Sequence, residues 1–351
     1  MLIYGAYGYT GTLIVEEALS RGLRPVVAGR DIDKVNALAE RYGLMGFAFE
    51  LMDTAALDRA LQNRRLVMHC AGPFTATFQP MAAACLRHRI HYLDITGEIE
   101  VFEGLAALDR QAREAGVMLL PGVGFDVVPT DCLAAHLKMR MPAATYLALA
   151  IRGGGGFSRG TRRTMLEGLG YGGAVRRDGR IVRVPAAWKT REVDFGDGRI
   201  RTTVTIPWGD VASAWYSTGI PNIEAYAAMP QSQIRWLKLS RYFGWLLRRA
   251  SVRARLRRRI ADAAPGPNTA LRASTQSFAW GEVRDDKGQV MRSRLRCING
   301  YEFTAKSAVS AAVRVIKGDA KTGFQTPSRA FGTEFVHTLG TSIEDLPLAR
   351  P

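Results

Sequence analysis

The chain has 351 residues, a length that favours two domains over one hydrophobic core. Hydrophobic residues make up 47% of the composition, as in ordinary globular proteins, which excludes disordered and collagen-like classes. The formal net charge of +16 suits nucleic acid, an anionic membrane surface or a phosphate-bearing ligand, so the positions of the basic residues must decide among them.

Membrane spans, leader sequences and metal sites have no recognisable signature in the sequence. No stretch approaches the roughly 20 consecutive apolar residues of a membrane span, and the opening run Leu2-Ile3-Tyr4 lacks the basic segment of a signal peptide. The four cysteines form no CxxC pair, and the five histidines form no HxxxH pair. We therefore expect a cytoplasmic protein without a metal site.

Short apolar runs alternate with amphipathic helical stretches through the first 135 residues. The expected strands cover residues 1–6, 25–28, 47–51, 66–70, 92–95 and 117–120. Helices are expected over residues 10–21, 32–42, 54–62, 80–88 and 102–115. Six strands in this rhythm predict an α/β fold, a Rossmann-type doubly wound parallel sheet, over residues 1–135.

The rhythm changes after residue 142. The next expected strands cover residues 145–151, 180–184, 192–195 and 201–206, and a long hairpin joins residues 273–283 to 289–297. A helix is expected over residues 304–316. This pattern predicts a second, α+β domain with a mixed or antiparallel sheet over residues 136–325, followed by a tail of residues 326–351.

The turn Gly5-Ala6-Tyr7-Gly8-Tyr9-Thr10-Gly11 lies between the first expected strand and the first expected helix. Glycine tolerates positive φ in a tight turn and lets the backbone approach a pyrophosphate. The following helix directs its N-terminal N–H groups at the phosphates, and Gly11 lies where that helix presses on the sheet. The residues predicted to bind a dinucleotide are Gly5, Tyr7, Gly8, Tyr9, Thr10 and Gly11; a glycine turn without a ligand is the alternative.

The end of the second expected strand distinguishes between the two nicotinamide dinucleotides. NAD sites place a carboxylate there to bind the ribose 2′-hydroxyl, whereas this strand ends at Arg30. A guanidinium suits a 2′-phosphate, and Lys34 adds a second positive charge one turn later. Asp31 is the competing acid, but its position fits a helix N-cap better. The sequence therefore predicts NADP as the cofactor.

Two further loops are expected at the cofactor. Asp53 closes the third expected strand and contacts the adenine edge in one interpretation, whereas in the other it caps the next helix. Ala71, Gly72 and Pro73 follow the fourth strand at the carboxyl edge of the sheet, where ligands bind in this architecture. Their small side chains leave room for the nicotinamide ribose, and an ordinary strand-to-helix loop is the alternative.

With these motifs in place, the chain resembles the saccharopine dehydrogenase-like oxidoreductase family. The segments that carry the resemblance are residues 4–11, 28–30, 70–74, 92–98, 121–131, 158–161, 323–327 and 330–332. The resemblance implies a Rossmann domain, an NADP-type cofactor, a second α+β domain and a C-terminal tail that returns to the first domain. It is closer to the bacterial branch with the trans-acting enoyl reductase than to true saccharopine dehydrogenases, whose arginine-rich substrate loops are not recognisable here.

Acidic residues follow the fifth and sixth expected strands, at the edge where the nicotinamide is expected. Hydride transfer leaves negative charge that needs a proton donor or a preorganised hydrogen bond. We predict Asp94 and Asp126 as catalytic candidates and Glu98 as a substrate contact, with Tyr171 as a further possible proton donor. For each carboxylate, capping a helix or binding backbone amides is the structural alternative.

Residues 153–161 are expected to meet residues 94–98 and 122–126 at the nicotinamide. Ser158 and Thr161 stand at the start of an expected helix, where N–H groups favour an anionic substrate group. An N-cap is the alternative role, and both roles are compatible.

Residues 235–259 contain ten Lys or Arg residues and no acidic residue. Leu239, Tyr242, Phe243, Leu246 and Ala250 recur at helical spacing, which predicts one basic helix with an apolar stripe. Packing of that stripe on its own domain is the favoured interpretation, and peripheral contact with an anionic membrane is the alternative. Nucleic acid is not expected, because the charge is confined to one helix and no nucleic-acid-binding module is recognisable.

Together these features predict an NADP(H)-dependent oxidoreductase that transfers a hydride to or from a small-molecule or acyl-type substrate. The alternatives are a non-catalytic NADP-binding accessory or sensor protein and a peripheral membrane scaffold. A homodimer and a location at the inner membrane surface both remain open.

Overall fold

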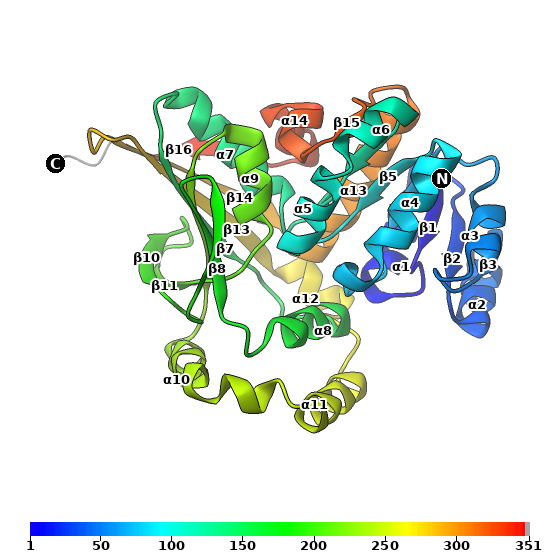
Figure 1. Cartoon of the computed structure of the whole chain (residues 1–351), viewed down its shortest axis with the longest axis horizontal. Coiled ribbons are helices and arrows are strands. Elements are labelled where there is room, and N and C mark those ends of the chain that lie inside the picture. Colours follow the sequence, from blue (N-terminus) through cyan, green and yellow to red (C-terminus); the bar gives the residue numbers. More distant parts are fainter. Residues whose placement is uncertain (348–351) are drawn as a thin grey trace. The chain divides into compact units, whose positions relative to one another are not determined.

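The computed structural model describes residues 1–347, which divide into two compact units (Figure 1). Unit 1 consists of residues 1–126 and 301–330, and unit 2 consists of residues 127–300 together with the described residues from 331 onward. Each unit is therefore built from two separate stretches of the chain.

The sheet of unit 1 is parallel throughout, with the strand order β15-β6-β5-β4-β1-β2-β3. Its strands are β1 (Leu2–Tyr4), β2 (Val26–Gly29), β3 (Gly46–Ala48), β4 (Leu66–His69), β5 (His91–Asp94), β6 (Met118–Leu120) and β15 (Gly323–Phe324). Because helices cover both faces, the central strands β1, β2 and β4 are buried at every residue and consist of apolar residues except for His69 at the end of β4. The predicted Rossmann-type doubly wound sheet is confirmed.

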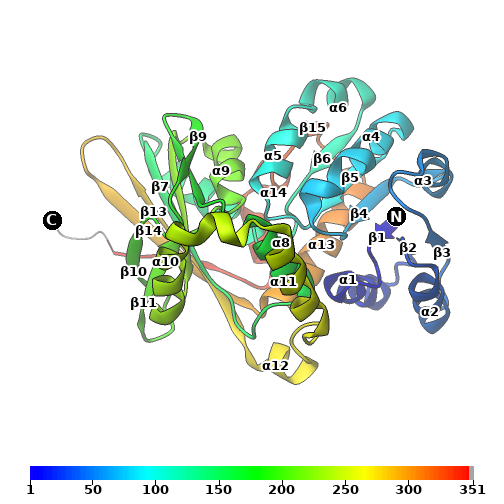
Figure 2. The ribbon, with the colours of Figure 1, turned by 60° about the horizontal axis from the view of Figure 1, so that its bottom comes forward.

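The helices of unit 1 lie on both faces of this sheet. They are α1 (Tyr9–Ser20), α2 (Ile32–Tyr42), α3 (Thr54–Leu61), the 3₁₀ helix η1 (Phe74–Ala76), α4 (Phe78–His88), α5 (Ile99–Ala106), α6 (Asp109–Ala115) and α13 (Gly300–Ile316). Helices α1 and α2 lie on one side of the sheet and α4 and α6 on the other (Figure 2). On the α1 side, Arg21 at the end of α1 donates a hydrogen bond to Ser310 of α13 at 2.8 Å.

The boundaries of the two units differ from the predicted domains. Nearly all of α13, and β15 after it, lie in unit 1 rather than in the predicted second domain, because β15 pairs in parallel with β6. The tail was predicted to return to the first domain, but its last strand, β16 (Ile343–Asp345), pairs antiparallel with β14 (Val290–Ile298) of unit 2. Residues 326–330 of the predicted tail lie in unit 1 and residues 331–347 in unit 2, while residues 348–351 lie outside the described residues.

Unit 2 contains a mixed sheet in the order β10-β11-β12-β7-β13-β14-β16, with β8 and β9 attached beside β12. Its other strands are β7 (Tyr146–Arg152), β8 (Gly173–Arg177), β9 (Arg180–Val184), β10 (Thr190–Asp194), β11 (Ile200–Thr205), β12 (Asn222–Ala228) and β13 (Gln276–Arg284). Strands β7 and β12 pair in parallel, whereas β13 and β14 form an antiparallel hairpin. The predicted α+β domain with a mixed sheet is confirmed.

The helices of unit 2 are α7 (Val128–Arg140), α8 (Arg159–Gly168), α9 (Asp210–Thr218), α10 (Gln231–Leu247), α11 (Ala250–Asp262), α12 (Thr269–Ser274) and the 3₁₀ helix η2 (Thr333–Leu339). A short helix, α14 (Pro327–Phe331), spans the boundary between the units in the sequence. Helix α7 packs on β13, where the side chain of Leu137 lies so close to Gly281 that a Cβ atom there would meet it at 2.6 Å.

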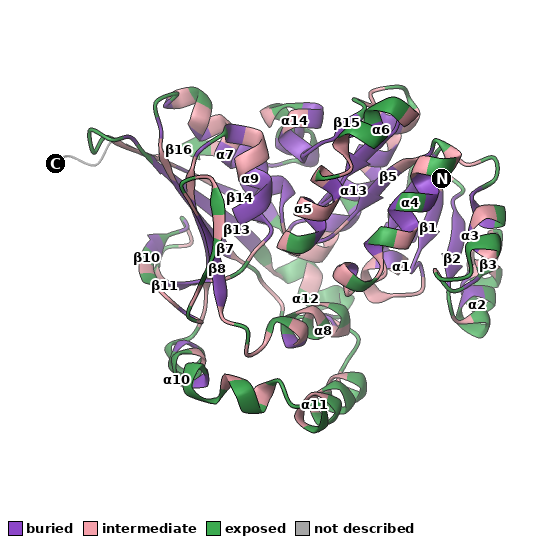
Figure 3. Ribbon diagram, in the orientation of Figure 1, coloured by how far each residue is buried: buried purple, intermediate pink, exposed green. Residues whose placement is uncertain are grey.

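The basic segment forms two helices rather than the single helix that was predicted. Arg249 adopts an extended conformation (φ −61°, ψ 136°) between α10 and α11, which breaks the helix. Arg253 and Arg257 of α11 then bind Glu167 of α8 at 2.8 and 2.9 Å, so that α11 packs on α8. Figure 3 shows both helices as largely exposed, and no residue of α11 is buried.

Candidate functional site

The glycine turn of unit 1 lies at the carboxyl edge of β1, in contact with the loop that follows β4. Gly5 has φ +82°, and a Cβ atom there would lie 2.9 Å from the backbone nitrogen of Ala71. A Cβ atom on Gly11 would lie only 2.3 Å from the carbonyl oxygen of Gly5. The predicted close approach of the first helix to the strand-turn backbone at Gly11 is therefore present in the structure.

We expect Gly11→Ala to lower the free energy of unfolding by about 1–3 kcal/mol, because the added methyl group would overlap backbone atoms, which cannot rotate away as a side chain can. This cost exceeds the gain of up to ~1 kcal/mol that alanine usually brings inside a helix. Chemical denaturation measures the difference. The matched control is Gly168→Ala on α8, where a Cβ atom meets nothing within 4 Å. Equal stability of the two variants would contradict the tight packing at Gly11.

Helix α1 begins at the turn and presents its first-turn N–H groups at the edge of the sheet. Gly8 is its N-cap with an extended conformation, and Thr12 donates a side-chain hydrogen bond to the carbonyl of Ala6 at 3.1 Å, which holds the turn against the helix. The amides of Thr10 and Gly11 belong to the first turn, where helices lack intrahelical acceptors and carry a partial positive charge. This arrangement fits an anion such as a diphosphate.

The end of β2 carries an exposed cation beside the aromatic ring of the turn. Arg30 follows β2 directly, and its guanidinium has no carboxylate partner among residues 1–347. Asp31 is the N-cap of α2 and accepts a hydrogen bond from the backbone of Lys34 at 3.2 Å, as the capping interpretation predicted. The Lys34 ammonium forms an ion pair with Asp31 and lies 5.7 Å from the centre of the Tyr7 ring. Arg30 is therefore the more available of the two predicted phosphate ligands.

The Tyr7 ring packs over the end of β2. A Cβ atom on Gly29 would lie 2.3 Å from the ring, so glycine is required there, and the Tyr7 hydroxyl accepts a hydrogen bond from the backbone of Asp31 at 3.3 Å. The tyrosine thereby links the glycine turn to the residues that would select the 2′-substituent.

The two remaining loops that were predicted to contact the cofactor contain Asp53 and residues 71–73. Asp53 is the N-cap of α3 and accepts a hydrogen bond from Ala56 at 2.9 Å, which is the capping alternative. Ala71, Gly72 and Pro73 lie next to the glycine turn, with a cis peptide bond between Gly72 and Pro73. Contact of either loop with the nucleotide stays a prediction.

Glu98 binds backbone amides within unit 1. Its two carboxylate oxygens accept hydrogen bonds from Phe74 and Thr75 at 2.9 and 2.8 Å, at the start of η1. This is the structural alternative considered for Glu98, and it ties the loop after β5 to the loop after β4. A substrate contact by the same carboxylate stays a prediction.

Asp94 ends β5 and is wholly buried. Its carboxylate accepts hydrogen bonds from the Tyr92 hydroxyl at 2.7 Å and from the backbone nitrogens of Thr96 and Gly122, both at 2.9 Å. Burial raises its pKa to about 7, although these three donors act in the opposite direction. Asp94 therefore holds the loops after β5 and β6 together, which is a positioning role.

The raised pKa of Asp94 makes the stability of the protein depend on pH. The folded chain holds this proton more tightly than the unfolded chain, whose aspartates titrate near ~3.9, so the free energy of unfolding falls as pH rises from about 4 to about 7. Asp94→Asn keeps both backbone hydrogen bonds through its amide oxygen and cannot ionise. We expect this variant to reduce the slope of the unfolding free energy against pH by up to about 1.4 kcal/mol per pH unit, as measured by urea unfolding. An unchanged slope, as in the exposed control Asp33→Asn, would contradict this assignment.

Asp126 is the last residue of the first of the two sequence stretches in unit 1. Unlike the wholly buried Asp94, it is partly exposed to solvent. It is half-buried, and burial raises its pKa to about 7. A Cβ atom on Gly97 would lie 3.3 Å from its Oδ2, so glycine leaves space beside the carboxyl group. Segments 94–98 and 122–126 therefore meet, as the sequence predicted, and Asp126 is the acid that combines a near-neutral pKa with partial exposure.

Sequence reasoning missed three residues that shape this edge of the sheet. His69 of β4 is wholly buried, and its Nε2 atom forms a hydrogen bond with the Thr77 hydroxyl at 2.9 Å. Burial lowers the pKa of His69 to about 3, so the imidazole is neutral. Thr304 and Ser307 of α13 bind the 122–126 loop, through Phe125 N at 2.9 Å and Val123 O at 2.7 Å. The small residues of α13 could have indicated close packing, but no sequence signal placed them at this loop.

The remaining predicted residues lie in unit 2. Ser158 is the N-cap of α8, and its hydroxyl accepts a hydrogen bond from the backbone of Thr161 at 3.2 Å. Tyr171 is exposed, with the guanidinium groups of Arg248 and Arg253 over its ring at 5.7 and 5.3 Å. A substrate role for these residues stays a prediction.

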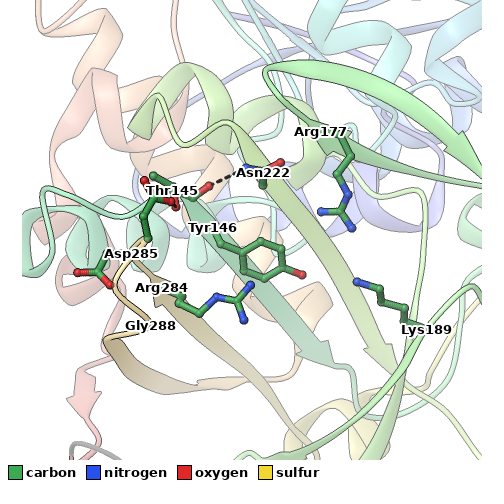
Figure 4. A pocket seen from close by; sticks show the side chains of 9 residues that line it. Thr145, Tyr146, Arg177, Lys189, Asn222, Arg284, Asp285 and Gly288 are labelled. Atoms are coloured by element: carbon green, nitrogen blue, oxygen red, sulfur yellow. Dashed lines mark hydrogen bonds between the residues drawn. The ribbon is translucent and has the colours of Figure 1, made fainter.

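A shallow pocket of about 620 Å³ lies on the sheet of unit 2 (Figure 4). Its lining residues are Thr145, Tyr146, Arg177, Lys189, Asn222, Arg284, Asp285, Asp286 and Gly288. Glu224 lies buried beside it and binds Arg177, Lys189, Tyr146 and Tyr226. Burial alone would raise the pKa of Glu224, but these four donors lower it to about 2. Two of the pocket's three cations are thus engaged by a structural carboxylate.

Residues 1–347 contain no metal-ligand cluster and no helix that could span a membrane. No group of three or more His, Cys, Asp or Glu side chains within this range is arranged to hold a metal ion. Among its helices, none is both long and apolar enough to cross a bilayer.

The first unit is similar to a known protein family. Residues 1–120 match the family model described as the saccharopine dehydrogenase NADP binding domain. A saccharopine dehydrogenase-like oxidoreductase of Mus musculus is 27% identical over 203 residues, which cover 50% of this chain and 47% of that protein. A putative trans-acting enoyl reductase of Mycobacterium tuberculosis is 31% identical over 183 residues, 48% of this chain and 44% of that protein.

These comparisons confirm the resemblance to the saccharopine dehydrogenase-like proteins that the motifs indicated. The chain matches less than half of the length of each relative. The solved structure of a saccharopine dehydrogenase (L-Glu forming) from Saccharomyces cerevisiae has a TM-score of 0.66 at 12% identity and 99% coverage of both chains, which shows a shared fold. Residues 1–120 of unit 1 are thus similar to a domain that binds a nicotinamide dinucleotide.

Proposed function

We propose that the protein is an NADP(H)-dependent oxidoreductase. The observation that carries the proposal is the exposed Arg30, without a carboxylate partner among the described residues, at the strand end beside the glycine turn. The turn supplies a cradle that a side chain at Gly5 or Gly8 would narrow, because Cβ atoms there would lie 2.9 and 3.1 Å from backbone atoms. These residues fit a diphosphate and a 2′-phosphate.

Each part of unit 1 then has a role. The amides of Thr10 and Gly11 and the N-terminus of α1 bind the diphosphate, and Arg30 binds the 2′-phosphate. A bound nicotinamide supplies or accepts a hydride. Asp126 holds a proton near neutral pH, and partial exposure lets that proton reach a substrate atom or solvent. Asp94 and Glu98 hold the surrounding loops in place.

For the substrate, we propose a small or acyl-type molecule with a polarised C=C, C=N or C=O bond. Support comes from the relatives named as trans-acting enoyl reductases, to which this chain is similar over about half of its length.

One observation favours the alternative of a non-catalytic NADP-binding sensor. Two of the three acidic candidates, Asp94 and Glu98, bind backbone amides, so most of the acidic groups at this edge have structural roles. If the protein is a non-catalytic sensor, Asp126 also has a structural role and transfers no proton.

Two measurements test the proposal. Titration calorimetry is expected to show at least tenfold tighter binding of NADPH than of NADH, because a guanidinium contact to a phosphate contributes about 1.5–3 kcal/mol. Loss of NADPH absorbance is then followed with a panel of enoyl, carbonyl and imine substrates. Binding without any turnover would favour the sensor, and binding of neither dinucleotide would overturn both functions.

A further inference from the structure

Helix α10 is attached to unit 2 by one face. Ile234 is buried and packs with Ala187 and Val204, and Leu237 packs against the same cluster. One turn further on, Arg241 donates hydrogen bonds to the carbonyls of Ala186 and Ala187, both at 2.7 Å. These contacts follow each other at intervals of three and four residues, so a single face of the helix is used.

An apolar stripe covers the opposite face of α10. It consists of Trp236, Leu239, Tyr242, Phe243 and Leu246, which are exposed by 49, 56, 75, 48 and 36%. At ~100° per residue, these positions point away from the face that holds Ile234 and Arg241. The favoured sequence interpretation, in which the stripe packs on its own domain, is therefore wrong. A cluster of large exposed apolar side chains of this size marks an interaction surface.

Uncompensated positive charge lies on α10 and on the following helix α11. Four basic residues of the segment bind elsewhere in unit 2: Arg241, Arg248, Arg253 and Arg257. The other six have no acidic partner in the described part of the chain: Arg235, Lys238, Arg249, Arg255, Arg258 and Arg259. Only Arg249 is engaged by an aromatic ring, that of the exposed Trp245 at 4.7 Å. The stripe and this cation set together are called the α10–α11 surface.

The combination favours an anionic bilayer over other occupants. A second copy of the chain would bring two positively charged helices together, which is electrostatically unfavourable. Nucleic acid would engage the cation set but leave Leu239 and Leu246 without an apolar partner. Anionic headgroups match the cations, while aromatic and leucine side chains enter the boundary between headgroups and acyl chains.

We propose that the α10–α11 surface docks the protein peripherally on anionic lipid bilayers, with the stripe inserted and the cation set on the headgroups. The attachment of α10 through Ile234 and Arg241 keeps the stripe exposed without rearrangement of unit 2. The proposal does not depend on the cofactor or on any reaction of unit 1.

Vesicle flotation with the full chain tests the proposal. We expect flotation with vesicles of phosphatidylglycerol and phosphatidylcholine at low salt, little with phosphatidylcholine alone, and release at about 0.5 M salt. Arg255→Gln/Arg258→Gln/Arg259→Gln should lower the partition coefficient about 100-fold, since each cation contributes about 1 kcal/mol at an anionic surface. Trp236→Ser/Phe243→Ser should lower it at least about tenfold.

The matched control removes three exposed arginines from elsewhere in unit 2, as Arg180→Gln/Arg199→Gln/Arg296→Gln, and should change the partition coefficient by less than about threefold. Circular dichroism and thermal melts verify that each variant is folded, which is expected because all the substituted side chains are exposed. Three results overturn the proposal: no flotation, equal loss in the control, or flotation unaffected by both surface variants. Binding of duplex DNA without flotation would assign the surface to nucleic acid instead. A stripe-dependent dimer without flotation would assign it to a second copy.

Discussion

We expect Arg30→Ala to lower the affinity for NADPH by about 10- to 100-fold and to change the affinity for NADH by less than about threefold. The guanidinium is exposed at the end of β2 and lacks a carboxylate partner among residues 1–347, so its hydrogen-bond donors are available to a 2′-phosphate. A charge-assisted contact of this kind contributes about 1.5–3 kcal/mol, which corresponds to that loss. Titration calorimetry with both dinucleotides measures the two affinities.

Two substitutions serve as comparisons for Arg30→Ala. Lys34→Ala should cost less NADPH affinity, because the ammonium is already paired with Asp31. Arg59→Ala removes an exposed cation from α3 and controls for the general loss of positive charge. Equal losses for NADPH and NADH in Arg30→Ala would mean that the arginine contacts a part common to both dinucleotides. Unchanged NADPH affinity would remove the proposed basis of the preference.

We expect Asp126→Asn to lower the turnover number with a substrate by about 10²- to 10⁴-fold and to leave the NADPH affinity within about twofold. The half-buried carboxyl group has a pKa of about 7, so it is partly protonated at neutral pH and suits proton donation. The amide cannot transfer a proton, while Arg30 and the glycine turn are unaffected. Stopped-flow loss of NADPH absorbance separates turnover from binding.

The pH profile gives an independent measure of the same role. If Asp126 donates a proton during reduction, wild-type turnover falls as pH rises through about 7, and Asp126→Asn removes this limb. Asp94→Asn is the comparison, because that carboxylate is wholly buried and binds three donors. We expect Asp94→Asn to lower turnover by less than about tenfold. Full activity of Asp126→Asn would assign the proton to another group.

Features that depend on neighbouring residues were predictable from the sequence. The glycine turn, the Asp31 cap and the parallel sheet of unit 1 follow from local spacing and alternation, and the structure contains all three. The length of a strand or the need for glycine at a turn is decided within a few residues. Local pattern is sufficient for such features.

Features that depend on distant partners were not predictable. Glu98 binds amides 23 and 24 positions earlier, and Phe125 binds Thr304 across 179 positions, so no spacing in the sequence indicates either contact. The break at Arg249 and the exposure of the α10 stripe fall in the same class. Helical periodicity identifies an apolar face, but tertiary packing decides whether Ile234 or Phe243 is covered.

The division of unit 1 between residues 1–126 and 301–330 has a consequence for synthesis of the protein. While the chain leaves the ribosome, β6 remains an open edge until β15 has been translated, and the 122–126 loop lacks Thr304 and Ser307 until α13 has been translated. Unit 2 has the same dependence, since β16 completes its sheet edge only near the C-terminus. Each unit is therefore expected to reach its native state only after its later stretch of sequence has been translated.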